Sequence, residues 1–127
     1  MAYGDVGGTV TELVITCQTP TSGTVAIAKG DAVKLTGGYT VTNATSAEDV
    51  VFGQALAGAT ENGVAIPVKV RGICVFTYSG ETAPTVNGAA GVLASATAGQ
   101  VKAPASGNGV GINVKVNTTD KLVHVLL

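Results

Sequence analysis

The sequence is poor in the residues that most often supply bulk or chemistry. Its 127 residues include no Trp, three Tyr, two Phe, two Cys and one His. Because aromatic rings are so few, we expect a core of Val, Ala, Ile and Leu, which fill the thin space between two sheets or inside a narrow barrel. Hydrophobic residues still make up 46% of the chain, enough for one domain with a sizeable core.

Charge is also scarce, since only 12% of the residues are charged and the formal net charge is −1. A protein that binds phosphate groups needs clustered cations. Here the seven Lys and Arg residues are spread along the chain with acids between them. We therefore expect no nucleic-acid partner and no electrostatically bound membrane. Low net charge weakens self-repulsion, so we expect a homo-oligomer.

Long apolar runs are missing as well. No stretch of about 18 apolar residues is present to span a membrane. The first residues lack the basic start and apolar stretch of a signal peptide, so we expect the chain to remain where it is made. Cys17 and Cys74 lie in separate apolar segments and not at a CxxC spacing, which predicts two buried thiols, with a disulfide between them as the alternative.

Short alternating apolar runs separated by turn residues fill the chain. The strongest run is 64–71, in which Val and Ile alternate with Ala, Pro, Lys and Arg. Its Pro67 predicts an edge strand or a bulge, because Pro has no N–H to donate. Gly37-Gly38 predicts a two-residue hairpin turn with positive φ at both positions, and Glu61-Asn62-Gly63 predicts a second hairpin.

Three further segments bear on the organisation of the chain. Residues 1–8 are Gly-rich without periodicity, so we interpret them as a flexible N-terminal arm, followed by a single all-β domain over 9–127. Residues 11–17 form a candidate strand that pairs within the subunit or with a neighbour. Residues 25–28 alternate like a strand, and 46–49 fit a capped single helical turn.

The strand pattern leads to the fold class. About eight to ten short strands, with no amphipathic helix longer than a turn, predict an all-β small barrel or sandwich with an extended arm. Residues 91–116 loosely echo residues 33–71. The echo has two interpretations, an internal duplication or the ordinary turn spacing of β proteins.

A search for reactive groups yields no catalytic set. His124 lies in the last strand, where a histidine that is hydrogen-bonded or solvated is expected, and a Cys–His pair requires one of the buried thiols beside it. Glu48-Asp49 is the only adjacent carboxylate pair and lacks the spacing of a calcium loop. The glycine clusters at 4–9 and 107–111 lack P-loop and dinucleotide-motif spacing. We predict no enzyme, no cofactor and no metal site.

Four segments together resemble the capsid decoration (cement, or head-stabilising) proteins of tailed bacteriophages. They are 29–35 (KGDAVKL), 37–39 (GGY), 51–57 (VFGQALA) and 65–73 (AIPVKVRGI). In that group a "GD-x-hydrophobic" strand leads to a glycine-containing strand and then to a "V-x-V-x-G" strand. The closing stretch 91–127 is similar to the end of the same proteins. The resemblance covers 25–127 by pattern and contains no diagnostic motif.

The resemblance implies a structural protein on the outer surface of an icosahedral capsid, made in the host cytoplasm. Its partner would be the major capsid protein, whose neighbouring subunits it would clamp, and a homotrimer at threefold positions is favoured. The arm would order on the capsid, which makes the following the candidate capsid-binding residues: Ala2, Tyr3, Gly4, Asp5 and Val6. The alternatives are another phage structural β-module (tail tube, fibre or adhesin domain) and a small β-barrel enzyme or ligand binder.

Overall fold

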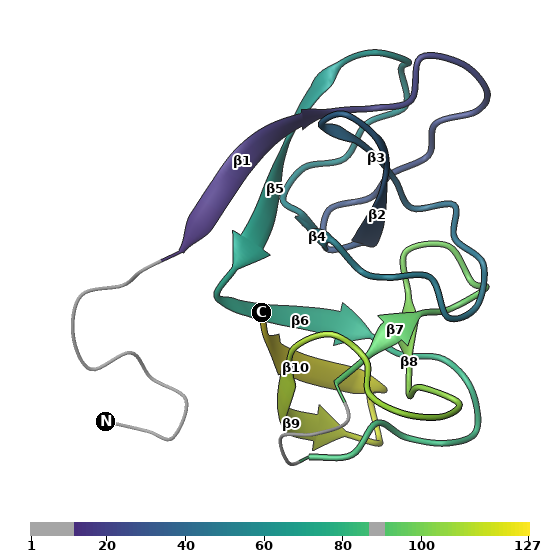
Figure 1. Cartoon of the computed structure of the whole chain (residues 1–127), viewed down its shortest axis with the longest axis vertical. Coiled ribbons are helices and arrows are strands. Elements are labelled where there is room, and N and C mark those ends of the chain that lie inside the picture. Colours follow the sequence, from purple (N-terminus) through teal and green to yellow (C-terminus); the bar gives the residue numbers. More distant parts are fainter. Residues whose placement is uncertain (1–11, 87–90) are drawn as a thin grey trace.

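A computed structural model describes residues 12–86 and 91–127 of the chain. These residues form ten strands and no helix, which confirms the predicted all-β class and strand number (Figure 1). The strands are β1 (Leu13–Gln18), β2 (Ala32–Gly37), β3 (Thr40–Thr42), β4 (Gly53–Ala55), β5 (Ala65–Arg71), β6 (Ile73–Thr77), β7 (Leu93–Ala94), β8 (Val101–Lys102), β9 (Ile112–Asn117) and β10 (Leu122–Leu126).

The first five strands form a closed barrel in the order β1-β3-β2-β4-β5. The candidate strand at 11–17 is realised as β1, which pairs antiparallel with β5 of the same chain over six positions. The barrel closes on the other side of β1 through one parallel bridge, Gln18 to Thr40. There the Gln18 N–H donates to the Tyr39 carbonyl at 2.8 Å.

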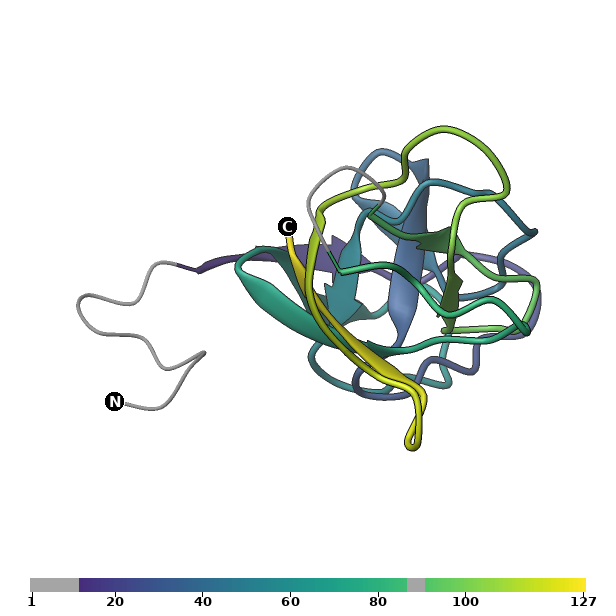
Figure 2. The same ribbon diagram turned by 90° about the horizontal axis from the view of Figure 1, so that it is seen from below.

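The remaining strands form a three-stranded sheet, β6-β10-β9, and the short pair β7-β8. Gly72, with φ +117°, separates β5 from β6, a conformation that a side chain would strain. Gly72 also binds the residue that follows β10, because the Leu127 N–H donates to the Gly72 carbonyl at 2.9 Å. The sheet lies beside one end of the barrel (Figure 1), and Figure 2 shows the same arrangement from below.

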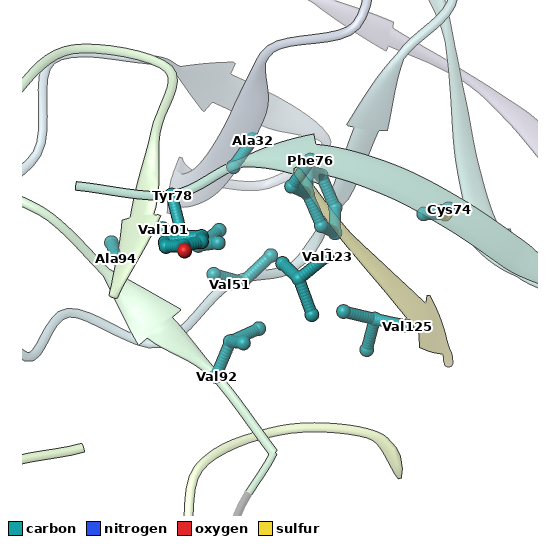
Figure 3. Packing of buried hydrophobic residues seen from close by; sticks show 10 residues of the cluster. All are labelled: Ala32, Val51, Cys74, Phe76, Tyr78, Val92, Ala94, Val101, Val123 and Val125. Carbon is teal, nitrogen blue, oxygen red and sulfur yellow. The ribbon is translucent and has the colours of Figure 1, made fainter. Parts of the chain in front are cut away.

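Two clusters of buried side chains hold these parts together. The barrel core contains Cys17, Val25, Ile27, Val33, Val41, Ala55, Ile66, Val68 and Val70. The second core, shown in Figure 3, contains Ala32, Val51, Cys74, Phe76, Tyr78, Val92, Ala94, Val101, Val123 and Val125. Val dominates both, as the composition predicts. The contribution of Leu is smaller than predicted, because no Leu of the described residues is fully buried and Leu127 packs against the second core only partly buried.

The prediction that Pro67 marks an edge strand or a bulge is wrong. β5 lies between β1 and β4, and Pro67 is opposite Thr16 in an unbroken stretch of the β1 register. β4 is only three residues long, and its pairing with β5 stops at Val68. Pro67 therefore lies beyond the part of β5 where β4 would require its N–H, while its carbonyl still accepts from the Leu56 N–H at 3.0 Å.

Three local predictions also need correction. The β2–β3 hairpin forms, but the left-handed residue of its turn is Tyr39, with φ 52°, and neither preceding glycine. Residues 46–49 form a turn and no helix, in which the Asp49 carboxylate accepts the Ser46 N–H at 2.8 Å. Residues 25–28 are buried in alternation, but among the described residues they make only one bridge, from Ile27 to Ala59.

Candidate interaction surfaces

The predicted capsid-binding residues, Ala2 to Val6, lie outside the described residues, as does the whole arm 1–8. Their role therefore stays a prediction. Within the described residues, the features that stand out are exposed apolar surfaces.

The outer face of the β6-β10-β9 sheet carries the clearest of these surfaces. Leu126 of β10 lies opposite Ile73 of β6 and Ile112 of β9 in the same register row. Their exposed fractions are 41%, 40% and 44%, and Val75 and Val114 are similarly exposed at 39% and 46%. Because the other face of the sheet packs on the second core, this outer face is a one-sided apolar surface open to a partner.

His124 lies at the centre of this outer face. It is opposite Val75 of β6 and Lys115 of β9. The neighbouring Val123 and Val125 point to the buried side, as the alternation of a strand requires. The face thus combines apolar side chains with a histidine and a lysine, and no carboxylate shares its rows.

The two cysteines are free and buried, as predicted, and they belong to different cores. Burial raises the pKa of the Cys74 thiol to about 11, and burial also raises the pKa of the Cys17 thiol. Cys74 points into the second core, whereas His124 lies on the opposite face of the sheet. The arrangement does not bring a thiol and the imidazole together as a nucleophile and its base.

The adjacent carboxylates Glu48 and Asp49 form ion pairs with two different lysines. Asp49 accepts from the Lys34 ammonium at 2.7 Å, and Glu48 accepts from Lys102. The hydrogen bond from Lys34, followed by that from the Ser46 N–H, lowers the pKa of the Asp49 carboxyl. The hydrogen bond from Lys102 likewise lowers the pKa of Glu48. Within residues 12–86 and 91–127, no three His, Cys, Asp or Glu side chains group as metal ligands would.

An open groove of about 720 Å³ lies between the barrel and the C-terminal sheet. Its apolar lining includes Leu35, Val50 and Phe52, and the Lys34–Asp49 ion pair lies along it. Val50 is 65% exposed. The groove is therefore a second apolar surface beside the sheet face, but its lining residues include no set of groups arranged for acid–base or nucleophilic chemistry.

β1 supplies a third surface, its unpaired edge. Apart from the bridge at Gln18, this strand pairs only with β5 in the part of the chain that the structure describes. Leu13 and Val14, which point to opposite faces, are 50% and 43% exposed. Tyr39, at the hairpin tip where the β3 contact ends, is 71% exposed. Figure 1 shows the first half of β1 projecting from the barrel.

Within the glycine cluster at 107–111, Gly109 lies in close contact with neighbouring backbone, whereas Gly107 has open space around it. A Cβ on Gly109 would lie 2.4 Å from the Val92 carbonyl oxygen, so the loop can approach β7 only without a side chain there. Val92 and Val110 exchange two hydrogen bonds across this contact, at 2.8 and 3.0 Å. Close backbone approach explains Gly109, whereas the positive φ of Gly107 and Gly111 agrees with the interpretation of the cluster as turn glycines.

The exposed faces were not singled out from the sequence, although one signal was present. Residues 73–78 are apolar at nearly every position, and a strand that is apolar on both faces is either sandwiched or open to a partner. No family model matches this chain, and no curated protein matches it. The described residues also contain no helix long and apolar enough to cross a membrane.

Proposed function

We propose that this chain is a structural virion protein that binds the outer surface of an icosahedral tailed-phage capsid and stabilises contacts between major capsid subunits. The observation that carries the proposal is the apolar outer face of the β6-β10-β9 sheet, with Ile73, Ile112 and Leu126 in one exposed row. A surface of this kind favours a protein partner, because its burial removes apolar area from water without a charged ligand.

The sequence supports the same proposal in two ways. The resemblance of residues 25–127 to capsid decoration proteins gives the partner class, and the low net charge of −1 permits close packing of many copies. Many equivalent contacts on one shell add avidity, so each can be weak. In the favoured trimer, we expect the subunit contacts to be apolar and to bury more than about 1,000 Å².

Co-sedimentation with expanded heads of the matching phage tests the proposal. The wild type should pellet with the heads, and Ile73→Ser/Leu126→Ser should pellet less with its melting temperature little changed, because both side chains are already partly exposed. Val50→Ser is the matched control, since Val50 is exposed at 65% but lies in the groove. Absence of wild-type protein from the pellet would refute capsid binding.

Deletion of residues 1–8 tests the arm separately. The described strands begin at Leu13 and pair without these residues, so we expect unchanged thermal melting together with weaker attachment to heads. A large loss of stability would show that the arm belongs to the core.

The second candidate is a tail-tube, fibre or adhesin module. The unpaired edge of β1 is compatible with it, because an open strand edge can pair with a strand of another subunit. Light scattering separates the two functions. A tube protein should polymerise by itself or on a tail platform, whereas a decoration protein should stay a small oligomer.

A further inference from the structure

Among the described residues, the edge of β1 that does not face β5 has a defined set of unpaired main-chain groups. The Thr19 N–H donates to the Val64 carbonyl at 2.9 Å, one position beyond the Gln18–Ala65 pair. Since main-chain groups alternate in direction along a strand, Cys17 and Ile15 also point toward β5. Gln18, whose N–H binds the Tyr39 carbonyl, points the other way. Val14 and Thr16 therefore direct their N–H and C=O groups to the open side.

The side chains along this edge are uncharged. β1 reads LVITCQ, and the nearest charged residue along the chain is Glu12, whose carboxylate is bound at 3.2 Å to Lys69, the β5 partner of Val14. Natural proteins commonly protect an edge strand with charges, Pro or a bulge near the open groups. In β1 the register shift lies at Leu13/Val14, at the outer end of the strand. The edge at 14–16 thus lacks charge and Pro and carries exposed β-branched side chains.

We propose that this edge pairs antiparallel with β1 of a second copy of the chain, about a two-fold axis at Ile15. In that register Val14 faces Thr16 of the second copy, and Ile15 faces its own counterpart. The pairing is self-consistent, because Val14 and Thr16 are the two residues with outward main-chain groups on both copies. Each Val14–Thr16 pair then exchanges two hydrogen bonds, as in any hydrogen-bonded antiparallel pair.

The chemistry of the strand favours a second copy over a charged partner. The opposed pairs are apolar or β-branched, which suits cross-strand packing, and no like charges face one another between 13 and 17. The contact is two-fold, so it joins copies in pairs, either single chains or members of neighbouring trimers. It goes beyond the proposed function and does not depend on a capsid.

Register-specific crosslinking tests the inference in solution. Val14→Cys and Thr16→Cys proteins are mixed under mild oxidation, and disulfide-linked dimers are separated on a non-reducing gel. Directly opposed positions have Cα atoms about 5.5 Å apart, within disulfide range. We expect the mixture to crosslink at least several-fold more than either variant alone, because 14 and 16 face each other and neither faces itself. The native thiols are buried, so wild type provides the background.

Charge provides an independent measurement. Val14→Glu/Thr16→Glu places carboxylates opposite one another and should lower the weight-average mass in sedimentation equilibrium. Ala65→Glu/Pro67→Glu adds the same charge to exposed positions of β5, away from the open edge, and should leave the mass unchanged. Equal crosslinking of the mixture and the single variants, or equal masses of the two Glu variants, would overturn the proposed pairing. Head binding that fails while crosslinking persists would refute only the proposed function.

Discussion

Gln54 joins the barrel to the C-terminal sheet, and its replacement by Met tests that connection. The side chain belongs to β4 and is only 8% exposed. Its amide Nε2 donates to the Val75 carbonyl of β6 at 2.7 Å and to the Gly30 carbonyl at 3.2 Å. Gln54→Met keeps the length of the side chain but removes both donors, so two carbonyl oxygens lose a partner.

The expected loss follows from these contacts. A net hydrogen bond contributes about 0.5–1.5 kcal/mol, and a buried acceptor left alone costs about 1–3 kcal/mol. Because the Gly30 contact is the longer one, we expect a total loss of about 2–3 kcal/mol in the free energy of unfolding. For a domain of this size that corresponds to a fall in melting temperature of roughly 8–12 °C.

Urea unfolding of the purified protein measures this loss. Gln18→Met is the matched control, because the Gln18 side chain is exposed and makes no side-chain hydrogen bond to the described residues, while its main-chain bond to Tyr39 is kept. We expect an unchanged denaturant slope and a lower midpoint for Gln54→Met alone. Two variants of equal stability would refute the idea that the Gln54 amide stabilises the junction.

Three further predictions concern ionisation, packing and thiol access. Since Lys34 lowers the pKa of Asp49, this pair stabilises the fold above the ordinary carboxyl pKa and loses that effect as the pH falls through the lowered value. The difference in unfolding free energy between wild type and Lys34→Met should therefore shrink from pH 7 to about pH 3. A constant difference in urea titrations would contradict this. Gly109→Ala should cost about 1–3 kcal/mol by overpacking, whereas Gly38→Ala, with open space at its Cβ, should melt near the wild type. Cys74 should react with a thiol reagent near pH 8 only as fast as the protein opens, because burial raises its pKa to about 11; rapid labelling of the native protein would show that the thiol is accessible.

The period-two pattern made the strands and their buried faces predictable. The alternation at 64–71 correctly gives the buried face of β5, because a residue's side is fixed by its position in a strand. The burial of both thiols followed in the same way from their apolar neighbours.

Strand pairing and exposure were less predictable. The parallel contact of β1 with β3 joins residues far apart in the chain, and no local pattern encodes it. The left-handed Tyr39 was missed because glycines precede it, although its carbonyl has to turn toward Gln18 to close the barrel. Composition predicts a core position for the leucines that the structure leaves exposed, because composition does not distinguish a buried face from an exposed one.

The position of β10 has a consequence for synthesis of the chain. β10 is the central strand of its sheet, with β6 and β9 on either side, yet it is the last of the ten strands in sequence order. The barrel, by contrast, uses strands between residues 13 and 71. On a ribosome the barrel strands can therefore pair first, while β6 has emerged but stays unpaired until residues 122–126 follow. We expect the nascent chain to be most prone to aggregation in that interval, and a pause in translation before residue 122 would lengthen it.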